Sequence, residues 1–189
     1  GCFVMNNQNL KPYPAYKPSD IPWLGNIPAH WEVVKSKSLF KEIIDKNHPK
    51  ETLLSVTQEN GVLPRTDSEI RVWNPGDDVT GYKLILPGDF VISLRSFQGG
   101  IELSNVKGIV SPAYIVLRRK LDIIDGYYKY WLKSKLFISV LSVFTTGIRQ
   151  GKTISYDDFK EIPSLVPPLA EQQAIAEYLD HETARLDAV

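Results

Sequence analysis

A helical segment at the C-terminus limits most strongly how this chain can fold. From Pro168 to Val189 the sequence has no glycine, asparagine or further proline that would end a helix. Pro168 suits a first helical turn, where its missing N–H costs no hydrogen bond. Ile175, Leu179 and Leu186 recur at helical spacing, so we expect them to pack against another helix. That helix belongs either to the chain's own body or to a larger assembly.

Charge separates this helix from the rest of the chain. The protein carries 22 basic and 22 acidic side chains, so its formal net charge is zero. Residues 168–189 hold five acidic side chains and one basic one, which leaves 17 acidic and 21 basic side chains in residues 1–167. The body is therefore mildly basic, at about +4, and the helix is acidic, at about −4. Because DNA phosphates repel acidic groups, we expect the helix to face protein.

The remaining sequence predicts short strands and helices without regular βαβ alternation, which favours an α+β fold with a mixed sheet. Prolines in residues 6–30 indicate an extended lead-in, anchored on the core by Trp23 and Trp31. Runs of β-branched and apolar residues predict strands at 52–57, 90–95, 108–111, 113–117 and 162–166. Apolar periodicity predicts helices at 36–47 and 125–144. Glycine and polar residues predict a loop or short hairpins at 60–81, loops at 96–100 and 145–152, and a short turn at 157–159.

Motifs typical of enzymes are missing from the sequence. The glycine spacings match neither a phosphate-binding P-loop nor a dinucleotide fingerprint, and there is no GxSxG nucleophile elbow. The single cysteine, Cys2, excludes an intramolecular disulfide, and the three histidines lack metal-ligand spacing. Glu102 and Lys107 resemble part of a nuclease site, but such sites need a second placed carboxylate. We therefore expect a binding module that uses no cofactor and no metal.

The ends of the chain and its apolar runs bear on location. No apolar run approaches the ~20 residues that span a bilayer, so we expect no membrane contact. The N-terminus lacks the features of a secretory signal, which makes a cytoplasmic location the expectation. We expect residues 1–4 to be non-native and the native segment to begin at Met5.

Four segments carry a resemblance to a known family. They are residues 23–31 (WLGNIPAHW), 87–95 (PGDFVISLR), 147–150 (GIRQ) and 167–175 (PPLAEQQAI). In combination they resemble the specificity subunit of type I restriction–modification systems, and the resemblance runs from about Ile21 to Val189. Such subunits carry two target recognition domains, each followed by a long helix, and the two helices pack antiparallel as a spacer. Each domain recognises one half of a split DNA target, while partner subunits perform the chemistry.

The resemblance implies a division of this chain into three parts. Residues 1–20 would be the lead-in, residues 21–167 a DNA target recognition domain, and residues 168–189 the start of the conserved spacer helix. The implied partners are double-stranded DNA, methyltransferase (modification) subunits and a motor-nuclease (restriction) subunit. The second recognition domain would come either from a longer chain or from a second copy that dimerises through the spacer helix.

Polar loops supply the candidate DNA contacts. Arginine and glutamine suit bidentate contacts with guanine and adenine edges, whereas lysine and threonine more often hold phosphates. Neighbouring glycines let backbone N–H groups approach phosphates. The candidate DNA-binding residues are Arg65, Arg71, Lys83, Arg95, Ser96, Phe97, Gln98, Thr145, Thr146, Arg149, Gln150 and Lys152. Arg149 and Gln150 lie in a family-wide motif, so phosphate contact or a structural role is the alternative to base reading there.

Two other functions compete with DNA recognition on the sequence alone. A protein–protein scaffold without DNA contact would depend on the acidic amphipathic helix. A small metal-dependent nuclease would depend on Glu102 and would cut DNA with magnesium alone. The absence of a second placed carboxylate makes the nuclease the weakest of the three hypotheses.

Overall fold

A four-stranded antiparallel sheet runs through the middle of the molecule. The structure is a computed structural model that describes residues 11–67, 78–94, 96–144 and 154–187. The strand order is β4-β11-β8-β9, and every neighbouring pair is antiparallel. The bounds of these strands are Phe40–Ile43 for β4, Ile115–Arg119 for β11, Phe90–Ile92 for β8 and Glu102–Leu103 for β9.

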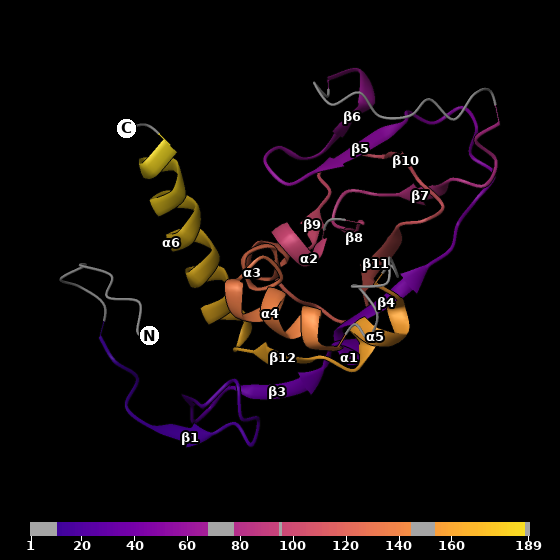
Figure 1. The fold of residues 1–189 in the computed structure, drawn as a ribbon. Helices are drawn as coiled ribbons and strands as arrows, with labels where there is room; N and C mark the ends of the chain where they lie inside the picture. Colours follow the sequence, from indigo (N-terminus) through magenta and orange to yellow (C-terminus); the bar gives the residue numbers. More distant parts are fainter. Residues whose placement is uncertain (1–10, 68–77, 95, 145–153, 188–189) are drawn as a thin grey trace.

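Four two-stranded antiparallel sheets surround this central sheet (Figure 1). They pair β1 (Tyr16–Pro18) with β2 (Asn26–Pro28), β3 (Glu32–Lys35) with β12 (Pro163–Val166), β5 (Leu54–Thr57) with β6 (Gly61–Pro64), and β7 (Lys83–Ile85) with β10 (Gly108–Val110). A parallel bridge joins Leu53 to Ile109. The β3–β12 sheet joins segments from the two ends of the body, and each strand pairs its backbone groups with the other.

Helices cover one side of the central sheet (Figure 1). They are α1 (Ser36–Leu39), α2 (Ser96–Gly99), α3 (Asp125–Trp131), α4 (Lys135–Phe144), α5 (Tyr156–Lys160) and α6 (Leu169–Asp187), with a 3₁₀ turn, η1, at Arg65–Asp67. Helix α6 packs on α3 and then projects away from the body. The mixture of helices and sheets without βαβ alternation confirms the expected combination of elements, but the sheets are antiparallel and not mixed as predicted: the one parallel contact in the described residues is the isolated bridge from Leu53 to Ile109. None of the helices in the described parts of the chain is long and apolar enough to cross a bilayer.

The central sheet separates two apolar clusters. Phe90 and Ile92 of β8 point into the main cluster, whereas Val91 between them points into the second one. This follows from the two-residue period of a strand, which sends successive side chains to opposite faces. The main cluster is rich in aromatic rings that meet edge to face, with Phe40 contacting both Phe90 and Tyr128. The second cluster lies beneath the β5–β6 and β7–β10 pairs.

Four predicted elements differ from the structure; one of them, the short turn expected at 157–159, is the five-residue helix α5. The helix expected at 36–47 is a single turn, α1, followed by strand β4, whose residues pair with β11 instead of continuing the helix. The loop expected at 96–100 contains a helical turn, α2. The helix expected at 125–144 is two helices: α3 ends at Trp131, and Ser134 caps α4, because its Oγ accepts a hydrogen bond from the Phe137 N–H at 3.1 Å.

Asp89, in the motif at 87–95, is fixed by a buried ion pair. Its side chain is 2% exposed, and Arg118 on β11 donates to both carboxylate oxygens at 2.7 Å. The Leu86 N–H donates to the same carboxylate at 2.9 Å. Gly88 adopts a φ of 92°, which favours glycine in the turn that brings Asp89 to this position. The motif therefore stabilises the start of β8.

Candidate functional site

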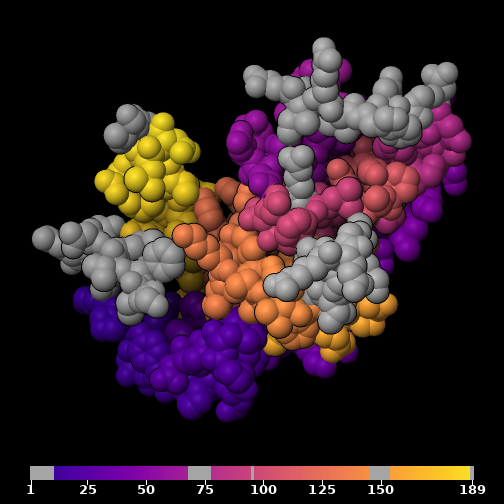
Figure 2. All heavy atoms as spheres, viewed as in Figure 1, coloured from indigo at the N-terminus to yellow at the C-terminus, as the bar shows by residue number. Residues whose placement is uncertain are grey.

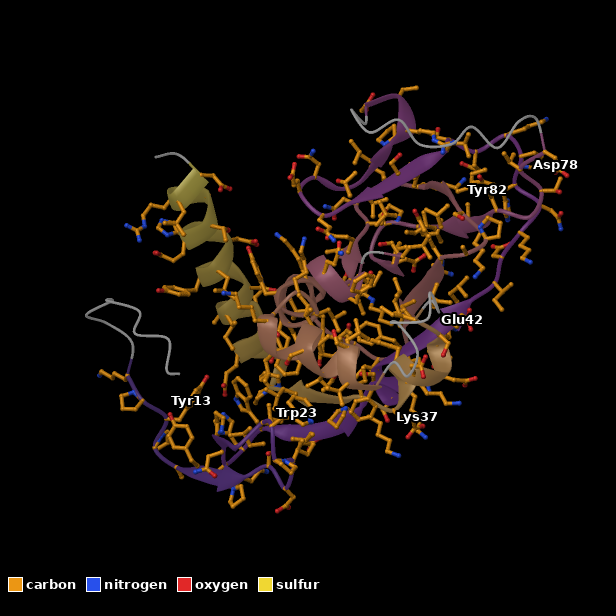
Figure 3. The ribbon with its side chains drawn as sticks, in the orientation of Figure 1. Tyr13, Trp23, Lys37, Glu42, Asp78 and Tyr82 are labelled. Carbon is orange, nitrogen blue, oxygen red and sulfur yellow. The ribbon has the colours of Figure 1, made fainter. Side chains whose placement is uncertain are left out.

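Glu171 at the start of α6 joins the two ends of the body. Its carboxylate accepts a hydrogen bond from Trp31 Nε1 at 2.8 Å and pairs with His30 Nε2 at 2.5 Å. Tyr13 stacks edge-on against Trp31, and burial together with the Glu171 carboxylate raises the pKa of Tyr13 to about 12. Figure 3 shows Tyr13 and Trp23 below α6 in this view. Two of the motifs that carried the resemblance, 23–31 and 167–175, thus contact each other directly.

Gln172, the next residue, is 1% exposed, and its side chain hydrogen-bonds backbone groups of Ile124 and Pro167. Its Oε1 accepts a hydrogen bond from the Ile124 N–H at 3.0 Å, at the N-terminus of α3. Its Nε2 donates to the Pro167 carbonyl at 2.8 Å. Glu171 and Gln172 together therefore set the angle at which α6 leaves the body.

Hydrogen bonding makes the stability that Glu171 contributes depend on pH. Burial opposes its ionisation, but hydrogen bonds from Trp31, His30 and Tyr13 outweigh that effect and lower its pKa below 4.5. A carboxyl whose pKa is lower in the folded state stabilises the fold above its unfolded pKa and loses that contribution as pH falls through the folded value. We expect Glu171→Gln to lower the urea midpoint at pH 7. We expect the difference from wild type to shrink below pH 4.5.

The same comparison on Glu177→Gln provides the control, because Glu177 is an exposed residue of α6 that pairs with Gln173 in the same helix. Its substitution should leave the midpoint nearly unchanged at both pH values. A Glu171→Gln deficit that stays constant down to pH 3 would contradict the assignment.

The residues predicted to pack against a partner helix occupy different environments. Ile175 is half-buried against the main cluster of the same chain, and its neighbour Ala176 packs on Gly126 of α3. The helix that Ile175 contacts is therefore within this body. Leu179 is half-buried, and Leu186 is 67% exposed near the far end of α6. Only the distal part of the predicted packing face is open to a partner.

Most of the predicted DNA-binding residues lie outside the described residues. These are Arg71, Arg95, Thr145, Thr146, Arg149, Gln150 and Lys152. Trp23 and Trp31, the expected core anchors, pack against the main cluster.

Two predicted DNA-binding residues point into the protein. Lys83 on β7 is buried; its Nζ donates to the Tyr114 carbonyl at 2.6 Å and lies 3.9 Å from Glu42. Burial lowers the pKa of Lys83. Ser96 is buried as well, and its Oγ accepts a hydrogen bond from the Ser93 N–H at 2.9 Å. Both side chains bind the protein itself, so we do not carry them into the proposed interface.

The remaining candidates lie at or near the surface. Gln98 on α2 is exposed, and Arg65 at the start of η1 is half-buried. Phe97 is half-buried against the main cluster, so most of its ring serves packing. Helix α2 packs against α4. Helix α4 ends at Phe144, the residue before the loop predicted at 145–152. The surface is hollowed between α6, in yellow, and the β5–β6 hairpin, in purple (Figure 2).

A second buried ion pair lies beside α2, and no sequence pattern predicted that its two members would meet. Lys133 Nζ bonds both carboxylate oxygens of Glu102, at 2.7 and 2.9 Å. Burial raises the pKa of Glu102, although Lys133 opposes the shift. Lys107, which the sequence placed near Glu102, instead pairs with Glu51. Among the described residues, no three His, Cys, Asp or Glu side chains gather so as to hold a metal ion.

Comparisons with known proteins agree with this fold. A family model described as the type I restriction modification DNA specificity domain matches residues 28–187. A putative type I restriction enzyme MjaX specificity subunit from Methanocaldococcus jannaschii is 25% identical over 172 residues, which cover 87% of this chain and 39% of that protein. The HsdS subunit of Thermoanaerobacter tengcongensis superimposes with a TM-score of 0.57 at 19% identity, over 86% of this chain and 39% of that one.

A second solved structure gives a similar match. A chain from a study of complex assembly and conformational transition of the type I R-M system superimposes with a TM-score of 0.60 at 20% identity, over 86% of this chain and 40% of that one. The present chain therefore spans about two fifths of the length of the relatives that it matches.

Proposed function

Because this chain belongs to the family of type I restriction modification DNA specificity domains, we propose that it recognises one half of a split duplex DNA target. In this proposal residues 21–167 form one target recognition domain, and residues 168–189 begin a spacer helix. The lead-in before residue 21 anchors the domain to that helix. The observation that carries the proposal is the family match, which extends over residues 28–187 and so includes both the body and α6.

The proposed DNA face combines α2, the β5–β6 hairpin and the polar segments at 65–71 and 145–152. Gln98 and Arg65 are its described members with side chains at or near the surface. Arg71, Arg95, Thr145, Thr146, Arg149, Gln150 and Lys152 complete it in the proposal. The mildly basic charge of residues 1–167 supports phosphate contact, which would position the domain while arginine and glutamine side chains contact base edges.

The distal part of α6 is the proposed docking element for other proteins. Leu186 is exposed there, beside acidic side chains that DNA would repel. We assign to this segment the contact with a second spacer helix, from the rest of a longer chain or from a second copy. Methyltransferase and restriction subunits would bind the assembled pair and perform the chemistry, so this chain itself would be non-catalytic.

Selection from a random duplex pool tests DNA recognition. The complete protein, assembled with its methyltransferase subunits, should enrich one short sequence motif per recognition domain. Binding should weaken steeply with salt, since each neutralised phosphate releases counterions: with about four contacts, affinity falls roughly 100-fold between 50 and 200 mM salt. Enrichment of no sequence, or binding that ignores salt, would refute the proposal in favour of a scaffold. Cutting by the chain with magnesium alone would favour a nuclease.

A further inference from the structure

Lys133 and Glu102 hold together the segments that carry the proposed DNA face. We propose that they are a positioning pair: they fix α2 and the β5–β6 hairpin at one spacing, and thereby set how sharply the domain discriminates between base sequences. This inference rests on the proposed function and adds to it residues that need not touch DNA.

The pair joins three segments that are distant in sequence. Glu102 lies on β9, Lys133 lies in the turn between α3 and α4, and Gln58 follows β5. In addition to its two bonds to Glu102, Lys133 Nζ donates to the Gln58 carbonyl at 3.3 Å. The ammonium group therefore bridges the turn of the β5–β6 hairpin to the central sheet.

The end of α2 is packed tightly against the same bridge. A Cβ added to Gly99 would lie 2.6 Å from the Gln58 side chain. A Cβ added to Gly100 would lie 2.7 Å from both the Leu132 carbonyl oxygen and Lys133 Cα, and Gly100 has a φ of 89°. Only residues without a side chain fit here without displacing a neighbour. A shift of Lys133 or Gln58 would therefore be transmitted directly to α2, which carries Gln98.

Stability alone gives a weak reason for this pair. The Glu102 side chain is 7% exposed and that of Lys133 is 32% exposed, so both groups lose much of their hydration. Well-packed apolar residues often replace such a pair without loss of stability. An apolar replacement, however, would form none of the three hydrogen bonds by which Lys133 holds the Gln58 carbonyl and Glu102 in one fixed geometry. The directional bonds favour a role in the placement of the hairpin.

Placement affects base contacts more than phosphate contacts. Bidentate contacts with a base edge need both bonds at once, whereas a phosphate accepts donors from many directions. A hairpin or an α2 that can shift should therefore lose discrimination between sequences while it keeps most of its non-specific affinity. This separation distinguishes a positioning role from a merely structural one.

The test is the double variant Lys133→Met with Glu102→Leu, which removes both charges together and leaves neither unpaired. The probes are the half-site that wild type enriches from a random duplex pool, duplexes with single base changes in it, and an unrelated duplex. We expect about a tenfold loss of discrimination, less than a twofold change in affinity for the unrelated duplex, and a nearly unchanged melting temperature. The matched control is Lys107→Met with Glu51→Leu, a pair whose lysine is exposed, which should leave all three quantities unchanged.

Other outcomes separate this inference from the function on which it rests. Discrimination equal to wild type in a folded double variant would overturn the positioning role and leave DNA recognition intact. Absence of any enriched half-site with wild type would overturn DNA recognition itself. Should the double variant fail to fold, Glu102→Gln provides the second measurement. Its amide oxygen can still accept one hydrogen bond from Lys133, but the second of the two native bonds is lost. An intermediate loss of discrimination supports the inference, and no loss overturns it.

Discussion

Replacing Arg118 with methionine is expected to lower the free energy of unfolding by about 3 kcal/mol. The substitution removes the guanidinium that binds both oxygens of Asp89 and leaves a carboxylate that is only 2% exposed. Of the hydrogen bonds that the structure shows to this carboxylate, only the one from the Leu86 N–H remains. Because the Arg118 side chain is 32% exposed, water partly relieves the loss, which places the cost near the lower end for a broken buried pair. Urea denaturation at pH 7 measures the change.

Lys107→Met is the control for that experiment. It breaks the Lys107–Glu51 pair, in which the lysine side chain is 52% exposed, and should cost less than about 1 kcal/mol. If Arg118→Met and Lys107→Met lowered the free energy of unfolding equally, the stabilising role assigned to the Arg118–Asp89 pair would be contradicted. The double variant Arg118→Met with Asp89→Asn should recover part of the stability, since no buried charge remains without its partner.

Replacing Gln172 with leucine is expected to cost about 2–4 kcal/mol, because it leaves two polar groups without partners inside the protein. The Ile124 N–H would lose its acceptor and the Pro167 carbonyl would lose its donor, although leucine has a volume close to that of glutamine. We expect a lower melting temperature and faster amide exchange at the start of α3.

The neighbouring residue offers a matched control. Gln173 is exposed on the same helix and pairs only with Glu177, one turn away, so Gln173→Leu should change stability by less than about 0.5 kcal/mol. If Gln172→Leu and Gln173→Leu had the same melting temperature, the proposed connection between α6 and α3 through Gln172 would be wrong.

Local sequence patterns predicted the helices and strands whose conformation depends mainly on their own residues. Helix α6 begins at Leu169 as expected, because the segment has no helix breaker after Pro168. Strands β8, β10 and β12 lie within the runs of β-branched and apolar residues that predicted them. By contrast, Phe40–Ile43 fits a helical pattern and becomes a strand only because β11 lies beside it. Such pairing depends on distant residues and cannot be read from a short window.

The candidate site was harder to predict for the same reason. Lys83 is a typical phosphate ligand by residue type. In the folded chain, however, its ammonium group donates a hydrogen bond to the Tyr114 carbonyl, which is 31 residues away in the sequence. Glu102 was visible in the sequence, but its partner Lys133 was not, because the turn between α3 and α4 positions that lysine. The motif containing Glu171 was recognised as a unit, whereas its contacts with His30 and Trp31 emerge only after folding.

The two apolar clusters on opposite faces of the central sheet have a consequence for how such a domain can change. Most of the buried aromatic rings and the anchoring tryptophans lie on one face, and the β5–β6 and β7–β10 pairs rest on the other. Of the residues of β8, Phe90 and Ile92 belong to the first face and Val91 to the second. Apart from the Lys133 bridge to the β5–β6 hairpin, substitutions on the Val91 face therefore have few packing contacts through which to reach the frame that holds α6. If the proposed function is correct, the hairpin could change its sequence while α6 keeps its place on α3.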